Sequence, residues 1–197
     1  MPELSTLTDG ELVRKAQAGE ETAFDELMVR YEGQIIGLAY RMLGHYHDSV
    51  EVAQEAFYRV YRGLAGFRRE ASFRTWLYGI TLNLVRHKRR WHIRHRTGRT
   101  VPLEMVIRKD EEGDSWEREI ADPKADPRQE VERSQLQEEI LQALEHLPGS
   151  VKTVVILRDI QDVPYEEIAR LTKEPVGTVK SRLHRGRAML RELLKGK

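Results

Sequence analysis

The sequence predicts an all-α protein with two small helical domains joined by a flexible acidic linker. Apolar residues recur three and four positions apart in residues 4–91 and again after residue 131, which is the spacing of one buried helix face. The alternation of single apolar and polar residues that marks strands is nearly absent. We therefore place the domains at residues 1–96 and 131–197, with the linker at residues 97–130.

Size and composition narrow the class of protein. The chain has 197 residues, enough for two small domains that each bury a modest core. Its net charge is only +1, which hides a strong segregation of charge along the chain. It has no cysteine, which excludes disulfides and thiolate metal sites and favours a reducing compartment. No stretch resembles a signal peptide or a membrane span, so we expect a cytoplasmic protein without membrane insertion of its own.

Helix-start and helix-stop signals define the first two helices. Thr8 and Glu11 have the spacing of a capping box, which begins a first helix that ends near Gly19. A second helix follows and ends at Gly44. It carries one apolar stripe that must be buried, made of Phe24, Leu27, Met28, Tyr31, Ile35, Leu38 and Met42.

A third helix opens at Asp48 and ends between Gly63 and Gly66. One face is apolar, and the other is polar and mostly acidic. The inner stripe is Val52, Ala56, Val60 and either Leu64 or Tyr61, while Glu51, Gln54, Glu55 and Arg62 point elsewhere. From the sequence alone, a solvated acidic face is the favoured interpretation of this pattern.

The fourth helix begins at Ser72, and its two halves differ in chemistry. Phe73, Leu77, Ile80 and Leu84 share one face and are predicted to be core. The sequence does not decide whether Trp76 belongs to the core or contacts nucleic acid, because an indole at a domain edge also stacks on exposed bases. The second half is a run of basic residues without an acid among them, namely Arg86, Lys88, Arg89, Arg90, Arg94, Arg96 and Arg99.

The short basic loop before this helix carries Phe67, Arg68 and Arg69. Aromatic rings accept unstacked bases, and guanidinium groups pair with the backbone phosphates of the same strand. The loop and the fourth helix together therefore indicate a surface for melted DNA.

The carboxy-terminal domain contains a helix-turn-helix pattern. A short helix from Tyr165 to Leu171 is followed by a turn of Thr172 to Glu174, and Pro175 opens a second helix. Its inward face is Val176, Val179, Leu183, Gly186 and Leu190. The opposite face carries Thr178, Lys180, Ser181, Arg182 and Arg185, which are residue types that contact guanine edges and phosphates in a major groove. A solvated basic face is the simpler alternative, but the tight turn between the paired helices favours DNA recognition.

Four stretches, in this order and spacing, resemble the extracytoplasmic-function (ECF) group of the bacterial sigma-70 family of RNA polymerase sigma factors. They are TDGELVRKAQAGEETAFDELMVRY, DSVEVAQEAFYRVYRGLAGF, SFRTWLYGITLNLVRHKRR and LPGSVKTVVILRDIQDVPYEEIARLTKEPVGTVKSRLHRGRAML. The resemblance covers nearly the whole chain apart from the linker. It implies a transcription initiation subunit with two helical domains, region two and region four, and with no enzymatic activity or cofactor of its own.

The same resemblance implies the protein partners. The third helix is expected to dock on the clamp helices of the beta-prime subunit of bacterial core RNA polymerase, the second domain on the beta flap, and the linker near the RNA exit path. An anti-sigma factor is implied as the regulator. The implied polymerase-binding residues are Asp48, Glu51, Gln54 and Glu55. Val50 departs from the family pattern, because an acid is usual at this position.

Promoter DNA is the third implied partner. The implied contacts with the minus-ten element are Phe67, Arg68, Arg69, Trp76, Asn83, Arg86, Lys88, Arg89 and Arg90. The helix that carries Thr178, Lys180, Ser181, Arg182 and Arg185 is implied to read the minus-thirty-five element. His87 occupies a position where the family often has aspartate.

Two other functions remain open from the sequence. A stand-alone helix-turn-helix repressor or activator would share the second domain, but it leaves the basic helix and its aromatic residues without a role. A metal-dependent nuclease using His45, His47 and Asp48 is a more distant alternative, because both histidines are expected in a loop and no fourth ligand is evident. We therefore expect no metal site.

Overall fold

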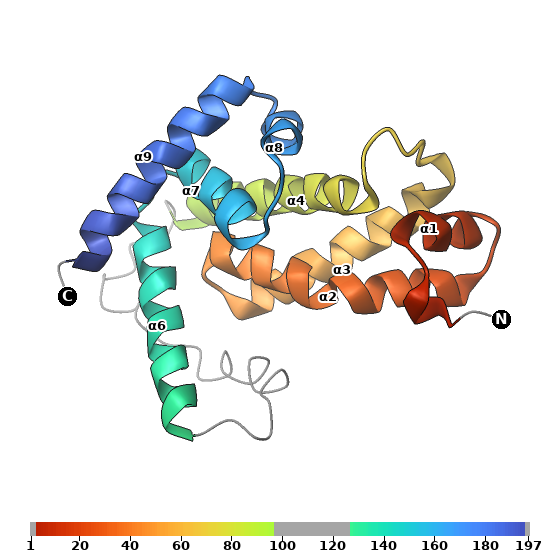
Figure 1. Ribbon diagram of the computed structural model, residues 1–197, viewed down its shortest axis with the longest axis horizontal. Coiled ribbons are helices and arrows are strands. Elements are labelled where there is room, and N and C mark those ends of the chain that lie inside the picture. The colour runs from red at the N-terminus through yellow and green to blue at the C-terminus, as the bar shows by residue number, and fades with distance from the viewer. Residues whose placement is uncertain (1–2, 97–126, 196–197) are drawn as a thin grey trace. The chain divides into compact units, whose positions relative to one another are not determined.

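A computed structural model describes residues 3–96 and 127–195, and these form two compact units divided after Arg94 (Figure 1). All regular elements of the described residues are helices, as the sequence predicts. The stretch from 97 to 126, which makes up most of the predicted acidic linker, lies outside the described residues.

The first unit begins with a short 3-10 turn, Leu4–Thr6, followed by α1, Asp9–Gln17, and α2, Glu21–Leu43. The predicted capping box at the start of α1 is confirmed, with Thr8 and Glu11 each accepting a hydrogen bond from the other's backbone amide. Gly19 and Gly44 have the positive φ angles expected where these two helices end. Each of the two stop signals read from the sequence is therefore correct.

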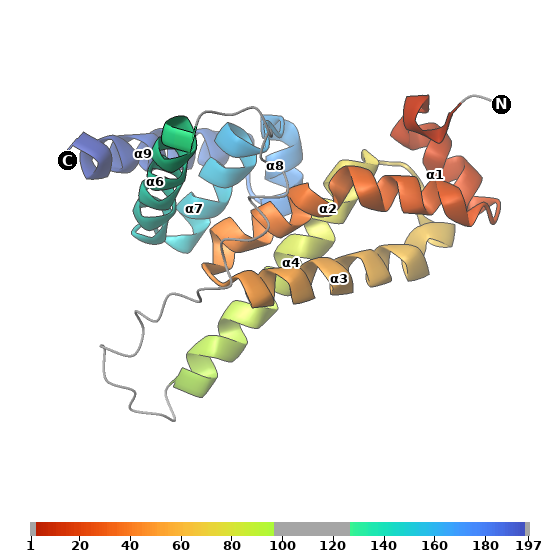
Figure 2. The same cartoon turned by 90° about the horizontal axis from the view of Figure 1, so that it is seen from below.

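The first unit is completed by α3, Tyr46–Gly63, a 3-10 turn, Leu64–Gly66, and α4, Phe73–Arg96. α2 and α3 lie side by side, and α4 crosses them (Figure 2). α3 begins two residues before the expected Asp48, at Tyr46, so His47 belongs to its first turn and the prediction of a loop there is wrong. The core is built from the predicted stripes together with Tyr78, Leu82 and Val85 of α4.

Three residues of the predicted inner faces of the first unit, Met28, Tyr61 and Ile80, are not buried as expected. Met28 of α2 is only half-buried. Leu64 is buried, whereas Tyr61 is 54% exposed, which settles the choice left open by the sequence. Ile80 is only half-buried, because the buried face of α4 is centred on Leu77 and Thr81 and passes to one side of it.

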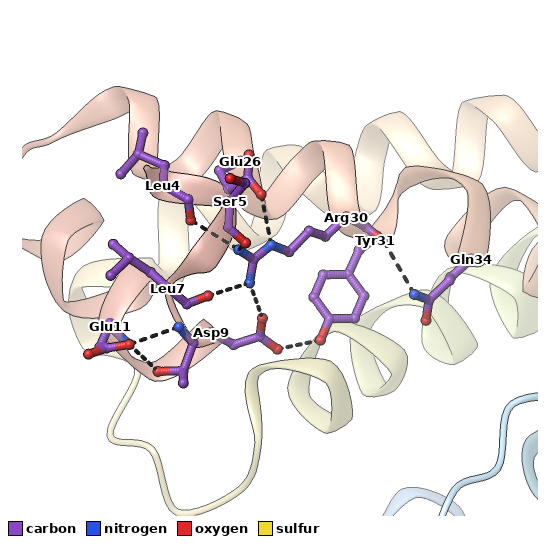
Figure 3. Close-up of polar contacts among 10 residues, drawn as sticks. Leu4, Ser5, Leu7, Asp9, Glu11, Glu26, Arg30, Tyr31 and Gln34 are labelled. Atoms are coloured by element: carbon purple, nitrogen blue, oxygen red, sulfur yellow. Dashed lines mark hydrogen bonds and ion pairs between the residues drawn. The ribbon is translucent and has the colours of Figure 1, made fainter. Parts of the chain in front are cut away.

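A polar cluster fixes the amino-terminal segment to α2 (Figure 3). The Arg30 guanidinium donates to the backbone carbonyls of Leu4, Ser5 and Leu7 at 2.7–3.0 Å, and it also pairs with Asp9 and Glu26. Because the guanidinium has five donors in a rigid fork, one side chain gathers several acceptors of a segment that forms little regular structure. The start of α1 is thereby held in place.

The second unit contains α6, Pro127–Glu145, α7, Gly149–Val155, a π-helical turn, Ile156–Ile160, α8, Tyr165–Thr172, and α9, Val176–Lys195. α6 starts at Pro127, inside the range assigned to the linker from sequence. The apolar spacing after residue 131 includes Leu136, Ile140, Leu144 and Leu147, which predicts one buried stripe. Leu144 and Leu147 are buried, but Leu136 is 55% exposed, so its predicted place in the stripe is wrong.

The predicted helix-turn-helix is formed by α8, Lys173 in a left-handed conformation, and α9. Pro175 precedes α9, and its carbonyl accepts hydrogen bonds from Thr178 and Val179, so the helix begins one residue later than expected. At Gly186, α9 approaches α7 so closely that an added Cβ would lie 2.5 Å from Val155 Cγ2 and 2.9 Å from Val151 Cγ1. Val179 and Leu183 are buried on the same face.

Candidate nucleic-acid and polymerase interfaces

The loop between α3 and α4 places Phe67 against Trp76. Their rings are stacked at a centroid distance of 4.5 Å and an interplanar angle of 13°. Trp76 also meets Phe73 edge-on at 6.2 Å, and it packs against Gly63, where an added Cβ would come within 3.2 Å of the indole. Trp76 is therefore partly core and partly the base of an aromatic stack, which explains why its sequence context favoured neither role alone.

Two arginines flank this ring stack. Arg68 and Arg69 are exposed, and Arg69 has a positive φ of 59°. A non-glycine residue in this conformation marks a backbone that its surroundings hold in an unusual turn. The support includes Gln17 of α1, whose side-chain amide donates to the carbonyls of Leu64 and Phe67. No sequence pattern points to Gln17, because it is a single polar side chain at the end of a helix.

The basic half of α4 separates into two faces. Asn83, Arg86, Arg89 and Arg90 are exposed, and Arg86 donates to the Asn83 side chain at 3.2 Å. Lys88 is different, because its ammonium lies 2.8 Å from Asp48 Oδ1 and also pairs with Glu51, both on α3. The structure thus brings one predicted DNA contact together with two predicted polymerase contacts.

Asp48 is the centre of this α3–α4 charge cluster. Its second carboxylate oxygen lies 2.7 Å from His92 Nε2, and only 14% of the Asp48 side chain is exposed. Partial burial opposes ionisation of Asp48, but the hydrogen bonds from Lys88 and His92 outweigh it and hold the Asp48 pKa below its ordinary value. Burial likewise disfavours the charged form of Lys88, yet the two carboxylates raise its pKa.

The two remaining predicted polymerase contacts on α3 face outward. Gln54 is exposed, and Glu55 pairs with Arg59 one turn later at 2.7 Å. Two large aromatic side chains, Tyr58 and Tyr61, are also more than half exposed on this helix. The outer surface of α3 therefore offers carboxylate, amide and phenol groups to a partner.

The outward face of α9 is largely as predicted. Lys180, Ser181 and Arg185 are exposed, and Thr178 is half-buried. Arg182 forms an ion pair with Glu174, the residue that closes the turn before α9. Lys180 lies over the ring of Tyr165 on α8 at 5.6 Å. His184 is also exposed, one turn after Lys180 and Ser181 on the same helix. The pattern of arginine, lysine and hydroxyl side chains that predicts this face does not include it.

The two histidines considered for metal binding, His45 and His47, contact different residues. His45 precedes α3 with its ring 6.0 Å from that of His92, and His47 is 3.2 Å from Glu51. In residues 3–96 and 127–195 the structure has no group of three or more side chains suited to hold a metal ion. The helices of the same ranges include none that is long and apolar enough to cross a membrane.

Comparison with known proteins places both units in one family. The model of sigma-70 region 2 matches residues 27–96, and the model of sigma-70 region 4 matches residues 137–190. The RNA polymerase sigma-H factor of Pseudomonas aeruginosa is 34% identical over 186 residues, covering 94% of this chain and 93% of the relative. The chain belongs to the sigma-70 family of RNA polymerase sigma factors.

Within this family, the sigma factor described here falls in the ECF group. The ECF RNA polymerase sigma-E factor of Haemophilus influenzae is 34% identical over 93% of this chain and 94% of its own length. The ECF RNA polymerase sigma factor SigW of Bacillus subtilis is 33% identical over 93% of this chain and 95% of its own length. The ECF family expected from the sequence motifs is thus confirmed. The region 2 model matches from within α2 to the end of α4, and the region 4 model from within α6 to within α9. Below, region 2 denotes the unit of α1 to α4, and region 4 the helices α6 to α9.

Two solved structures share the fold of this sigma factor. CnrH, solved in complex with the cytosolic domain of CnrY, matches with a TM-score of 0.67 at 24% identity over 96% of this chain and 98% of its own. The sigma factor RpoE of Bartonella quintana, solved in complex with the anti-sigma factor NepR, matches with a TM-score of 0.65 at 19% identity over 87% of this chain and 96% of its own.

Proposed function

We propose that this sigma factor is a cytoplasmic, non-enzymatic subunit that binds core RNA polymerase and directs it to promoters through two DNA-binding surfaces. The observation that carries the proposal is that one chain presents two different surfaces. One is an exposed basic helix face, suited to duplex DNA, and the other is an aromatic stack next to two exposed arginines, suited to a single strand. A stand-alone repressor or activator needs only the first of these surfaces.

Region 4 reads the minus-thirty-five element as a duplex in this proposal. The helix-turn-helix presents the amino-terminal half of α9, where Thr178, Lys180, Ser181 and Arg185 share the outward face. Recognition helices use this half to reach base edges in the major groove. Arg182 also contacts DNA in this proposal, after its guanidinium breaks the ion pair with Glu174. Ile160, at the end of the π-helical turn, is exposed, and we assign this apolar side chain of region 4 to the contact with the polymerase beta flap.

Region 2 recognises and melts the minus-ten element. The loop supplies Phe67, Arg68 and Arg69 as DNA contacts. The positive surface continues along α4 through Asn83, Arg86, Arg89 and Arg90. A base that leaves the duplex gains stacking at the aromatic side chains, and its phosphates gain the guanidinium groups. Trp76 contributes by supporting Phe67. Lys88 belongs to this set only when it leaves its carboxylate partners on α3.

The outer surface of α3 binds the clamp helices of the beta-prime subunit. Gln54 and Glu55 are its accessible polar residues, and Asp48 and Glu51 lie at its amino-terminal end beside α4. This surface is chemically distinct from the basic DNA-binding face of α4, which allows polymerase and DNA to be held at once. Two weak DNA contacts on one tether then gain from effective concentration.

An anti-sigma factor is the proposed regulator. RpoE of Bartonella quintana, which shares the fold, is solved with such a partner. A protein that covers α3 and the face of α9 would block polymerase and promoter together.

Run-off transcription from a pool of genomic promoters, with bacterial core polymerase in the presence and absence of this protein, tests the proposal. We expect new start sites that depend on the protein and share two upstream elements. Absence of new starts, combined with specific duplex binding by the protein alone, would instead establish a repressor or activator.

Substitutions separate the two DNA surfaces. Arg185→Ala should lower transcription from promoters that require the upstream element by about ten- to a hundredfold, the effect of one base-reading arginine. Arg191→Ala is the matched control, because it removes an exposed arginine from the carboxy-terminal half of the same helix. Both variants should bind core polymerase like the wild type, and loss of that binding in Arg185→Ala would contradict the assignment of α9 to DNA.

A further inference from the structure

The loop that carries Phe67, Arg68 and Arg69 is fastened to the rest of region 2 by one side chain from α1. Gln17 Nε2 donates to the Leu64 carbonyl at 2.9 Å and to the Phe67 carbonyl at 3.1 Å. A glutamine side chain has two amide hydrogens on this nitrogen, and the two contacts use both of them. Because both partners are carbonyl oxygens, the side chain can only sit with its nitrogen toward the loop.

The two carbonyls stand at the start and at the end of the single 3-10 turn that leads out of α3. The Phe67 amide closes this turn on Leu64 at 3.1 Å, and Gln17 adds a second donor to the same acceptor. Beyond Phe67 the chain leaves helical geometry and passes through the left-handed Arg69. Gln17 therefore holds the backbone at the last point before the exposed arginines.

Phe67 is consequently fixed from two sides. Its carbonyl is held by Gln17, and its ring is stacked on Trp76, which in turn packs against Gly63. A shift of the Phe67 backbone would break the hydrogen bond, and a shift of its ring would break the stack. Such a preformed surface binds a ligand without the entropic cost of ordering a loop.

Gln17 itself is well placed to act as a rigid support. It is the last residue of α1, and the backbone turns directly after it at Gly19, with the Glu20 amide bonding to the Lys15 carbonyl at 3.1 Å. The other end of α1 is fixed by the capping box and by the Arg30 cluster. Because α1 is fixed at its start, Gln17 at its end holds the loop backbone in one position.

We propose that Gln17 is a positioning residue for base capture: by holding the Leu64 and Phe67 carbonyls, it keeps the Phe67–Trp76 stack and the adjacent arginines in the geometry that accepts an unstacked base. The proposal rests on the proposed function of region 2. Gln17 is half-buried and directed at the loop backbone, so its effect on DNA passes through the loop.

Two substitutions remove this support. Gln17→Leu keeps most of the side-chain volume and deletes both donors, and Gln17→Glu keeps the shape but turns a carboxylate toward two carbonyls. Lys15→Gln is the control, because it breaks the ion pair with Glu20 at the same end of α1 without a contact to the loop. Hydrogen exchange in the loop amides after Leu64 should rise in both Gln17 variants, with exchange in α2 and α3 unchanged, and this comparison separates a loosened loop from an unfolded unit.

The decisive measurement is the binding of holoenzyme to single-stranded minus-ten oligonucleotides with one abasic site at successive positions. For the wild type, removal of the captured base should weaken binding by roughly ten- to a hundredfold, the size expected for one stacked base. In the Gln17 variants this ratio should fall by about three- to tenfold, consistent with the loss of two neutral hydrogen bonds. Binding of duplex minus-thirty-five DNA should not change.

The outcomes distinguish this inference from the function on which it rests. A wild-type holoenzyme that is insensitive to every abasic position would overturn base capture by region 2. A sensitive wild type, with the same abasic ratio in Gln17→Leu, Gln17→Glu and Lys15→Gln, would overturn the role of Gln17 alone. A proportional weakening of all oligonucleotides in the Gln17 variants would mark a structural role only, and would also overturn it.

Discussion

Region 2 and region 4 hold their helices together by different means. In region 2, single polar side chains tie together segments far apart in the sequence, as Gln17 does for the loop and Lys88 for α3 and α4. In region 4, the central contact is the close apolar approach of α7 and α9 at Gly186, and most residues of the outward face of α9 have no part in it. The fold and the binding surface therefore share residues in region 2 and are nearly separate in region 4.

This difference predicts how substitutions will act. In region 4, a side chain of the binding face can change without disturbing the core, and a core residue can change without altering the face. In region 2, residues such as Asp48 and Lys88 contribute to both properties, so substitutions of these residues should change stability and DNA or polymerase binding together.

The largest effect is expected from Gly186→Ala in region 4. A methyl group 2.5 Å from Val155 Cγ2 forces α7 and α9 apart, and such overpacking costs about 2–3 kcal/mol. Hydrogen exchange of α7 and α9 in the full chain should show the loss, with region 2 unaffected. Gly177→Ala is the matched control, because a Cβ there meets no atom within 4 Å and alanine favours the helix. Equal destabilisation by both substitutions would contradict the close approach.

A smaller loss should follow Arg30→Ala in region 2. The variant leaves the carbonyls of Leu4, Ser5 and Leu7 without their charged donor, and we expect a loss of about 1–2 kcal/mol. Faster exchange should be confined to the first residues and α1. Arg14→Ala removes an exposed arginine from α1 and serves as the control. If exchange at the start of α1 stayed at the wild-type rate, the amino-terminal segment would not depend on Arg30.

Asp48→Asn should cost about 1 kcal/mol at neutral pH, because it removes the charge shared by Lys88 and His92. The folded state lowers the Asp48 pKa, so this stabilisation is complete above the ordinary aspartate range and is lost as the pH falls through the lowered pKa. Urea unfolding of both proteins, followed by Trp fluorescence, should therefore converge in acid. Arg59→Gln, which breaks the exposed pair with Glu55, should have almost no effect. A difference that persists unchanged at low pH would argue against a charge effect.

The smallest effect is expected for Glu174→Gln in region 4. Removal of the carboxylate frees Arg182 and reduces repulsion of phosphates, so duplex affinity should rise about threefold and the dependence on salt should steepen. Fluorescence anisotropy with holoenzyme and minus-thirty-five duplex measures both quantities. Glu192→Gln removes an equal charge near the end of α9 and should change neither. Similar changes in both variants would mean that only net charge matters.

The predictability of the two regions from sequence follows the same division. The helix-turn-helix and its outward residues follow from periodicity, because Lys180, Ser181 and Arg185 occupy one helix and need no tertiary contact to share a face. Glu174 and Arg182 are only eight residues apart, but their ion pair could not be predicted from the sequence, because it depends on the left-handed turn at Lys173.

Region 2 was predictable in its helices and much less so in its contacts. The capping box and both glycine stops are local signals, and they were correct. The pairing of Lys88 with Asp48 spans α3 and α4, and the support by Gln17 spans 47 and 50 residues. No periodicity encodes such contacts, because they depend on how helices are placed against each other. The assignments of individual residues to polymerase and DNA remain predictions.

Gln17 and Arg30 share one property that bears on how this protein tolerates sequence change. Both side chains hold main-chain carbonyl oxygens, which every amino acid supplies. The side chains of Ser5 in the amino-terminal segment and of Arg68 in the loop are exposed and take no part in this support. Exposed loop residues such as Arg68 can therefore be exchanged while the backbone that presents them stays the same. Under the proposed function, such an exchange would change the preferred base.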